Sequence, residues 1–256
     1  VFDMNEANIT VTGLQLETTR TGDGNSVVRL YELDDSTISH NIIRIINADS
    51  YARKGITAYG NEMTTNYGIL KVYNNIITRL GGTTGADGMR FQCYESYNSP
   101  FTVVLYNNTI ANADDNGVVF RGNDIRYYAK NNLFINSGNA DYGTDDINSS
   151  YAHTSNNITS DGSSPDGSEF QNKTVSFVDV GNYDFHLAST DTVAKNAGAD
   201  LFNDPYINFS DDIDGSTRNV DGQGFDIGAD ELATKIYRSV GNTGDDLANG
   251  GTVTIS

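Results

Sequence analysis

The chain has 256 residues and a formal net charge of −18, with 34 acidic against 16 basic side chains. This charge argues against a nucleic-acid partner, because phosphates bind to basic surfaces. The longest apolar runs are a few residues, which predicts no membrane insertion in this segment. Cys93 is the only cysteine, and this excludes an intrachain disulfide and a cysteine-based metal site.

The two ends of the chain both resemble strands. It opens with VFDMNEANITVTGLQLE and ends with GTVTIS. We therefore expect a piece of a longer polypeptide whose targeting segments lie outside it. The acidic composition suits an extracellular or cell-surface location, which we take as an expectation.

An asparagine pair recurs through the first 160 residues, at spacings of 34, 33, 24 and 25. Asparagine is poor in a strand interior and favours turns, yet the residues before each pair alternate with the period of a strand. This combination predicts stacked β coils that turn a corner at the pair. Successive coils are about 4.8 Å apart, so the side-chain amides of neighbouring coils can hydrogen-bond along the stack. The predicted ladder consists of the second asparagines, Asn41, Asn75, Asn108, Asn132 and Asn157.

A further row of strands precedes the asparagine row, in residues 27–32, 55–60, 88–94 and 117–122. Alternate apolar residues in this row are expected to face inward. They are Val28, Leu30, Ile56, Ala58, Met89, Phe91, Val118 and Phe120. Cys93 continues the inward parity, which predicts a buried small hydrophobe rather than a reactive thiol.

These coils and their asparagine rows resemble the right-handed parallel β-helix family, which includes pectate-lyase-like proteins and bacterial surface β-helix proteins. The resemblance covers about residues 5–160 and implies an all-β solenoid with an asparagine ladder. We expect parallel β-helix coils over residues 1–173 and an irregular C-terminal closing segment over 174–232 that covers the helix end. Residues 233–256 are predicted to begin a further module or linker.

The row of strands at 27–32, 55–60, 88–94 and 117–122 also gathers basic and aromatic side chains on its outward face. The candidate ligand-binding residues, with those at the entering turn, are Arg29, Tyr31, Lys54, Tyr59, Asp87, Arg90 and Arg121. Arginine forks bind carboxylate or sulfate and tyrosine rings stack on sugars, so one hypothesis is a groove for an anionic polysaccharide. The other is an ordinary solvent-facing wall in which tyrosine serves strand propensity and stacking between coils.

Two enzymatic hypotheses use the same wall. A polysaccharide lyase needs a base and a cationic partner for the uronate carboxylate, roles that fit Lys54, Arg90 and Arg121. The resemblance also implies calcium-binding acids beside the base, and here only Asp87 and the Asp114–Asp115 pair lie in neighbouring turns. A glycoside hydrolase needs two carboxylates, for which Asp87 and Asp115 are the candidates, but the accompanying histidine motifs are absent.

The three histidines are predicted to act separately. His40 replaces the first asparagine of a pair, His153 falls in an outward strand row, and His186 lies in the DFHL strand of the closing segment. No two of them share a register, which argues against a histidine-based metal site.

The stretch DDIDGSTRNVDG offers two interpretations. Asp212 and Asp214 precede a glycine as in calcium loops, which makes Ca²⁺ the candidate cofactor. The alternative is structural, with Arg218 forming a salt bridge to Asp226, Asp230 or Glu231.

Taken together, these patterns predict a structural or adhesive module of a large extracellular or cell-surface protein. Its expected partners are polysaccharide, other surface-protein modules or further copies of itself. The alternative is a polysaccharide lyase or, less favoured, a glycoside hydrolase acting on an acidic glycan.

Overall fold

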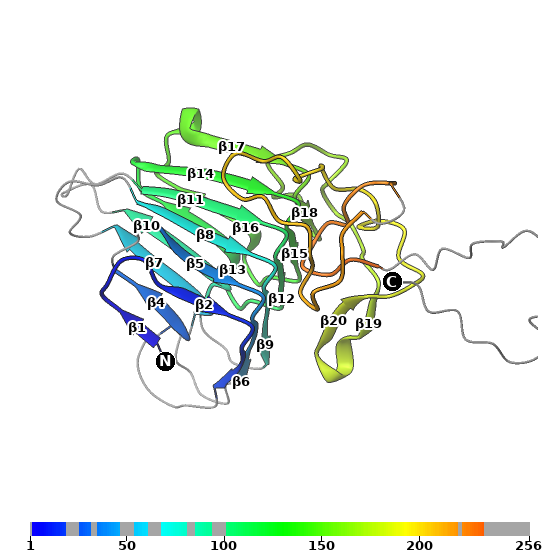
Figure 1. The fold of residues 1–256 in the computed structure, drawn as a ribbon. Helices are drawn as coiled ribbons and strands as arrows, with labels where there is room; N and C mark the ends of the chain where they lie inside the picture. The colour runs from blue at the N-terminus through cyan, green and yellow to red at the C-terminus, as the bar shows by residue number, and fades with distance from the viewer. Residues whose placement is uncertain are drawn as a thin grey trace, which may run out of the picture.

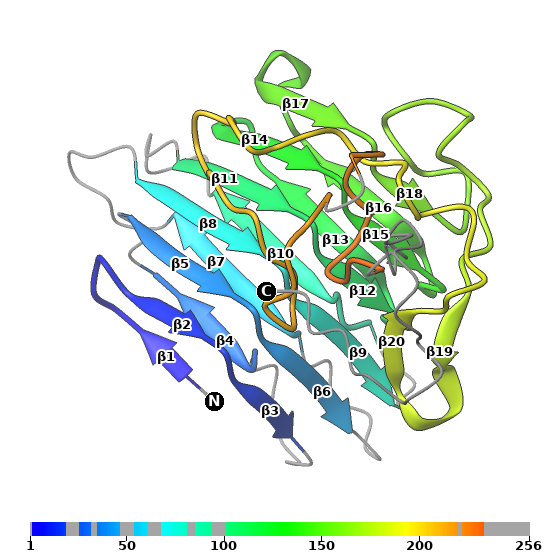
Figure 2. The ribbon, with the colours of Figure 1, turned by 45° about the vertical axis from the view of Figure 1, so that its right-hand side comes forward.

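A computed structural model describes residues 2–18, 26–31, 35–46, 54–60, 68–80, 85–93, 101–219 and 222–232. Its dominant feature is a parallel β-helix built from three sheets of six strands (Figures 1 and 2). Each coil contributes one strand to each sheet, so every strand pairs in parallel with strands of the neighbouring coils. The predicted all-β solenoid is confirmed.

The three sheets take their strands in strict rotation along the chain. Sheet A contains β1 (Phe2–Met4), β4 (Val28–Leu30), β7 (Ile56–Gly60), β10 (Met89–Cys93), β13 (Asn116–Arg121) and β16 (Ala140–Asp145). Sheet B contains β2 (Thr10–Thr12), β5 (Ser36–Ser39), β8 (Ile69–Tyr73), β11 (Phe101–Tyr106), β14 (Ile125–Lys130) and β17 (Ala152–Ser155). Sheet C contains β3 (Gln15–Thr18), β6 (Ile42–Ile46), β9 (Ile76–Leu80), β12 (Thr109–Ala111), β15 (Leu133–Ile135) and β18 (Ile158–Thr159).

The interior of the helix is a continuous apolar column. All eight residues predicted to face inward from sheet A are at most 1% exposed, and Cys93 is buried beside them. Aromatic rings stack inside the later coils, with Phe91 and Phe120 centroids 5.3 Å apart and Phe120 and Tyr127 centroids 3.9 Å apart. Full burial of one such side chain stabilises a fold by about 1.5–3 kcal/mol, so the column is the main apolar contribution of the coils.

The asparagine ladder runs through the corner between sheets B and C, and its members are fully buried. Nδ2 of Asn41 donates to Oδ1 of Asn75 at 3.0 Å, and the same Nδ2-to-Oδ1 bond repeats at 2.8–3.0 Å through Asn108, Asn132 and Asn157. Each Oδ1 also accepts the backbone N–H of the preceding ladder asparagine. Every amide is therefore satisfied only when the coils stack in register.

Two different residues terminate the ladder. In the first coil Leu14 occupies the ladder position, and only its backbone N–H donates to Asn41 Oδ1, at 3.1 Å. Beyond the last coil the carboxylate of Asp166 accepts from both the backbone N–H and Nδ2 of Asn157, each at 2.7 Å. A charged acceptor binds more strongly than a neutral one, which suits the last amide of the stack, where no further asparagine follows.

The first residue of each pair has a separate role. His40, Asn74, Asn107, Asn131 and Asn156 all have left-handed backbone angles, with φ between 48° and 56°. Asparagine tolerates this region better than most residues because its short polar side chain can bond locally. The pair therefore combines a left-handed corner residue with a ladder residue, which is why it recurs in every coil after the first.

Residues 160–173 cover the last strands of sheets A and C. The Asp161 carboxylate accepts from Asp141 N, and the Ser163 hydroxyl accepts from Tyr142 N, both in β16. In β18 the backbone N–H of Thr159 donates to the Phe170 carbonyl. This loop thus covers the ends of sheets A and C, whereas the segment after residue 174, predicted to cover the helix end, contacts the last coil from its flank at Asn156 and Ile158.

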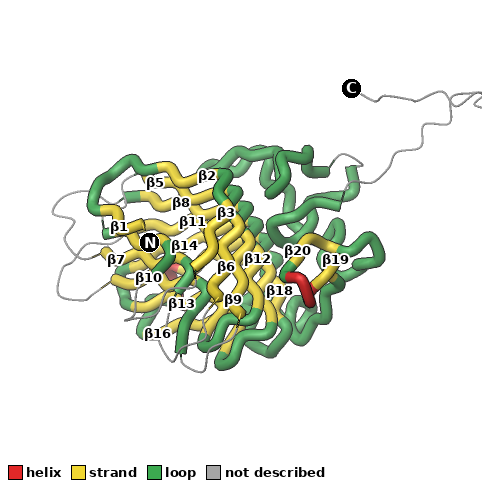
Figure 3. The backbone as a smooth tube through the Cα atoms, turned by 90° about the horizontal axis from the view of Figure 1, so that it is seen from below, coloured by secondary structure: helices red, strands yellow, loops and turns green. Residues whose placement is uncertain are grey.

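The closing segment instead lies along the flank of the helix, beside sheets B and C (Figure 3). It begins with an antiparallel hairpin of β19 (Phe177–Asp179) and β20 (Asp184–Leu187) and continues without regular elements. One apolar cluster packs Phe185, Leu187 and Ile227 on the outer face of sheet C. Another packs Leu201, Phe209 and Phe225 on Val104 and Tyr106 of sheet B. Apolar residues on the outer faces of sheets B and C explain this position, because the closing segment removes them from water by packing on them.

The left-handed asparagines bind this segment through their side chains. Asn74 donates to the Asp211 carbonyl, Asn107 to the Asp226 carbonyl, and Asn156 to the Ala197 carbonyl, at 2.8–2.9 Å. Asn131 exchanges two hydrogen bonds with the backbone of Ala199. The inner asparagine row thus joins the coils, and the outer row attaches the closing segment.

Arg218 is fully buried at this junction. Its Nη1 lies 3.1 Å from Glu231 Oε2, and its Nη2 donates to Asn74 Oδ1 at 2.9 Å and to the Ala229 carbonyl at 2.8 Å. Its Nε donates to the Asp211 carbonyl. The structural interpretation of the arginine is confirmed, with Glu231 as its partner.

We predict that Asn108→Ala destabilises the helix by about 3 kcal/mol or more. The change leaves Asn75 N–H, Asn132 Oδ1 and the Val72 carbonyl buried without that partner, and each such loss costs about 1–3 kcal/mol. Denaturant unfolding measures the effect against Asn208→Ala, an exposed asparagine of the closing segment. Equal stability of the two variants would contradict the role of the ladder.

We predict that Arg218→Met loosens the closing segment before the coils unfold. The change leaves Glu231 as an unpaired buried charge, and breaking one partner of a buried pair costs about 3–5 kcal/mol. Hydrogen exchange should show faster exchange in residues 196–230 and little change in β8 and β11. The control is Arg126→Met at an exposed site. Uniform exchange through coils and closing segment in the arginine variant would show that the two unfold as one unit.

Candidate functional site

The sequence-predicted residues occupy two outward columns on sheet A and one column at its entering corner. Parallel register aligns Tyr59, Gln92, Arg121 and Asp145 in one column, and Asp3, Arg29, Thr57 and Arg90 in the other. The corner column contains Lys54, Asp87 and Asn116, each directly before a glycine. The predicted residues therefore align by register along sheet A, but Thr57, Lys54 and Asp87 are buried, so the columns are interrupted at the surface.

Stacked glycines create the corner that positions Lys54 and Asp87. A Cβ added to Gly55 would lie 2.6 Å from the Gly88 carbonyl oxygen, and one added to Gly88 would lie 2.6 Å from the Gly117 carbonyl oxygen. Larger residues are therefore excluded where the coils approach so closely. The side chain before each glycine is held at the same height in successive coils.

Arg29 and two tyrosines form a compact group at the N-terminal end of the wall. Tyr31 and Tyr59 stack with ring centroids 5.6 Å apart. The Arg29 guanidinium lies 5.3 Å from the centroid of Tyr31, and its Nε lies 2.6 Å from Asp3 Oδ1. This arrangement offers aromatic faces beside a cation, the chemistry that sugar rings with acidic groups bind.

The remaining arginines of the wall are each paired with a carboxylate. Asp87 is buried, and its Oδ2 accepts from Nε and Nη2 of Arg90 at 2.6 Å. Its Oδ1 accepts from Asn116 Nδ2 at 3.0 Å. Arg121 Nε lies 2.8 Å from Asp145 Oδ2 at a more exposed position. The two predicted carboxylate clamps therefore already have anionic partners within the chain.

Lys54 is buried near these charges. Burial lowers the pKa of Lys54, and the charge of Arg90 lowers it further. Arg121 acts in the same direction, whereas Asp87 and Asp115 oppose the shift. A lysine with a lowered pKa is a better base at neutral pH than an ordinary surface lysine.

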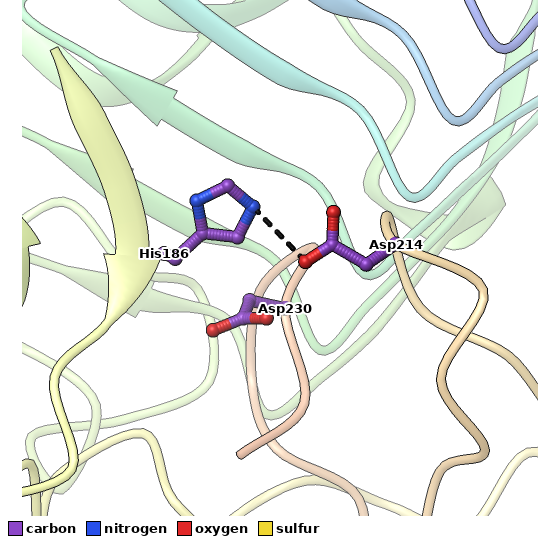
Figure 4. Close-up of side chains that lie close together, drawn as sticks. All are labelled: His186, Asp214 and Asp230. Carbon is purple, nitrogen blue, oxygen red and sulfur yellow. Dashed lines mark ion pairs between the residues drawn. The ribbon is translucent and has the colours of Figure 1, made fainter. Parts of the chain in front are cut away.

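A second group of polar side chains gathers in the closing segment, where His186, Asp214 and Asp230 converge (Figure 4). His186 Nδ1 lies 2.5 Å from Asp184 Oδ1, and its Nε2 lies 3.4 Å from Asp214 Oδ2. Burial alone would lower the pKa of His186, but the hydrogen bond to Asp184 and the neighbouring carboxylate charges outweigh burial and raise it. Burial raises the pKa of Asp230.

Asp212 and Asp214, the residues predicted to bind calcium, direct their carboxylates to different partners in the structure. Asp212 Oδ1 accepts backbone N–H groups of Asp214 and Ser216, and its Oδ2 accepts that of Glu231. These bonds fix the turn and occupy the carboxylate. Asp214 instead points to His186 from an exposed position. The three histidines share no register with one another in the sequence, and the meeting of His186 with carboxylates from distant loops has no counterpart in any sequence pattern.

Comparison of the chain with protein-family models, with curated proteins and with solved structures finds no match. Across the residues that the structure describes, no helix has the length and apolar character needed to cross a bilayer.

We predict that Lys54→Met leaves the melting temperature unchanged or raises it. The lowered pKa means that the charged lysine is less favourable in the folded chain than in water, so its removal relieves an unfavourable contribution at neutral pH. Thermal unfolding beside Lys71→Met, a partly exposed lysine on sheet B, measures this. A marked fall in stability for Lys54→Met alone would show that the lysine holds the wall together.

Proposed function

We propose that this chain is a structural or adhesive β-helix module of a large extracellular or cell-surface protein. The observation that supports it is the division of the outer surface. The closing segment packs its apolar clusters on sheets B and C, whereas sheet A presents columns of tyrosine, arginine and carboxylate. The coil shape and the ladder also support a kinship with pectate-lyase-like β-helix proteins, which is part of the proposal.

Polysaccharide is the favoured partner of this wall. The stacked rings of Tyr31 and Tyr59 offer a platform for sugar faces, and Arg29 lies beside them for an acidic substituent. Arg121 lies farther along the Tyr59 column, with its side chain 37% exposed. An acidic glycan lying along the helix axis would contact these groups in turn.

Other surface modules, including further copies of this chain, are the second class of partner. Among the described strands, β1, β2 and β3 each pair with a strand on one side only. A strand edge with unpaired backbone groups accepts another strand readily. An additional coil stacked on this end would continue all three sheets.

A polysaccharide lyase is the alternative function, and the lowered pKa of Lys54 favours it. One feature weighs against it. Arg90 is held by the buried carboxylate of Asp87, so its guanidinium is not available as a second clamp beside Arg121. Glycoside hydrolysis is weaker still, because the hydrogen bonds to Arg90 and Asn116 occupy both oxygens of Asp87.

We predict that the protein binds an acidic polysaccharide and that Tyr31→Ala combined with Tyr59→Ala weakens this binding at least about tenfold, or about 1.4 kcal/mol. Calorimetric titration with alginate, pectate and sulfated glycans measures the affinity. Tyr151→Ala is the matched control, since Tyr151 stacks with Arg126 away from sheet A. Equal binding by both variants would remove the wall from the proposal.

The lyase alternative is tested in the same panel by the ultraviolet absorbance of unsaturated uronates. Product formation that disappears in Lys54→Met would replace the module proposal with an enzyme. Binding without product formation supports the module. If the protein neither binds a glycan nor forms product, glycan contact is excluded and assembly with other modules remains. Sedimentation of the intact chain measures that assembly.

A further inference from the structure

Three parts of the closing segment meet at one point, and each brings one metal-ligating side chain (Figure 4). His186 comes from β20, Asp214 from the turn after Asp212, and Asp230 from the last described stretch. One ligand atom from each lies within 4.8 Å of the others. The group is far from the sheet A wall in sequence, and its chemistry does not depend on the function proposed above.

The histidine is oriented as a metal ligand would be. Its Nδ1 lies 2.5 Å from Asp184 Oδ1, and a carboxylate accepts a hydrogen bond only from a protonated nitrogen. In the neutral ring this leaves the lone pair on Nε2, which lies 3.4 Å from Asp214 Oδ2. A carboxylate that fixes the far nitrogen of a ligating histidine is the usual outer support of protein metal sites.

The Nε2 atom is buried and makes no hydrogen bond. It lies 3.4 Å from Asp214 Oδ2, longer than a hydrogen bond from nitrogen to oxygen ordinarily is. Ligand atoms bound tetrahedrally at about 2.0–2.1 Å from one ion lie about 3.3–3.4 Å apart. The spacing of this one pair matches two ligands of a small cation, and the three ligand atoms together lie within 4.8 Å of one another.

The carboxylates add charge and rigidity. Asp230 is 7% exposed, and its Oδ2 accepts the backbone N–H of Leu187 at 2.7 Å, which holds it beside the histidine. With Asp184 and Asp214, three carboxylates surround one imidazole, and after the charge of Arg44 in the adjoining pocket is counted the group keeps an excess of negative charge that a divalent cation would neutralise. Asp214 is exposed, so the site is open to ions from solvent.

A pocket of about 370 Å³ adjoins the cluster and is lined by His186 and Asp214. It lies between the β19–β20 hairpin and residues of β3, β6 and β9. Its volume is sufficient for water molecules that would complete the coordination of an ion. Three protein ligands with further positions open to water make a coordination shell suited to a divalent ion.

We propose that His186, Asp214 and Asp230 form a binding site for a divalent transition-metal ion, with Zn²⁺ as the first choice. The imidazole ligand favours Zn²⁺ over Ca²⁺, which prefers six or more oxygen ligands. Because the ligands come from three parts of the closing segment, the ion cross-links that segment where it covers sheet C. Metal binding then stabilises the folded chain in proportion to its affinity and concentration.

The test is calorimetric titration of chelator-treated intact protein with ZnCl₂, followed by thermal unfolding with and without the ion. We expect saturable binding of one ion per chain and a rise in melting temperature. Asp214→Asn should weaken binding at least tenfold without harming the fold, since Asp214 is exposed. His186→Gln should do the same, whereas His153→Gln, on sheet B, should bind as the parent chain does.

Cobalt substitution provides an independent readout, because a Co²⁺ ion with a nitrogen ligand absorbs visible light and His186→Gln would change that spectrum. No saturable binding, or equal affinity in the parent and Asp214→Asn, would overturn the proposal. Tighter binding of Ca²⁺ than of Zn²⁺ would also overturn the assignment to a transition metal. Loss of binding in Asp214→Asn with unchanged melting temperature of the metal-free protein supports it.

Discussion

The buried amide at the corner between sheets B and C is the constraint on which the rest of this structure depends. A primary amide has two donors and one acceptor with two lone pairs, and leaving them unpaired in an apolar interior is unfavourable. Asn75 meets this demand through Asn41, Asn108 and two backbone carbonyls. Since the partners belong to neighbouring coils, the hydrogen bonds fix the register of the whole stack. The coils can differ in loop length, but their corners must coincide.

The same corner also determines where the closing segment lies. The left-handed asparagine before a ladder asparagine directs its side chain away from the helix interior, toward backbone carbonyls of Ala197, Ala199, Asp211 and Asp226. Apolar residues on the outer faces of sheets B and C supply the remaining contact. One sequence pair therefore performs two tasks, with one amide joining the coils and the other binding the covering segment. The consequence is an asymmetric surface in which sheet A differs from its two neighbours.

Some charged groups are buried in ion pairs that hold the fold together, whereas others lie near solvent and can bind an ion. Arg218 and Glu231 are buried and paired, and Arg90 is held by a buried carboxylate. These pairs are parts of the scaffold. His186 and Asp214 lie closer to solvent and satisfy each other incompletely, which is the property expected of a site that receives an ion. In a chain with net charge −18, affinity for cations is expected at many carboxylates, and the histidine distinguishes this cluster from the others.

The sequence by itself determined the coils. The spacing of Asn41, Asn75, Asn108, Asn132 and Asn157, together with period-two alternation, was sufficient because ladder and core repeat locally in every coil. It also predicted the buried Cys93 and the salt bridge from Arg218 to one of three acids. Candidate wall residues such as Arg29 and Arg121 were placed correctly on sheet A, but their partners Asp3 and Asp145 were not foreseen.

Only the tertiary structure decided what lies outside the repeat. Three features depend on irregular segments that have no repeat. They are the end of the ladder at Asp166, the flanking position of the closing segment, and the meeting of His186 with Asp214 and Asp230. No pattern in the sequence specifies such contacts, because each forms once, between segments whose relative position is fixed by packing.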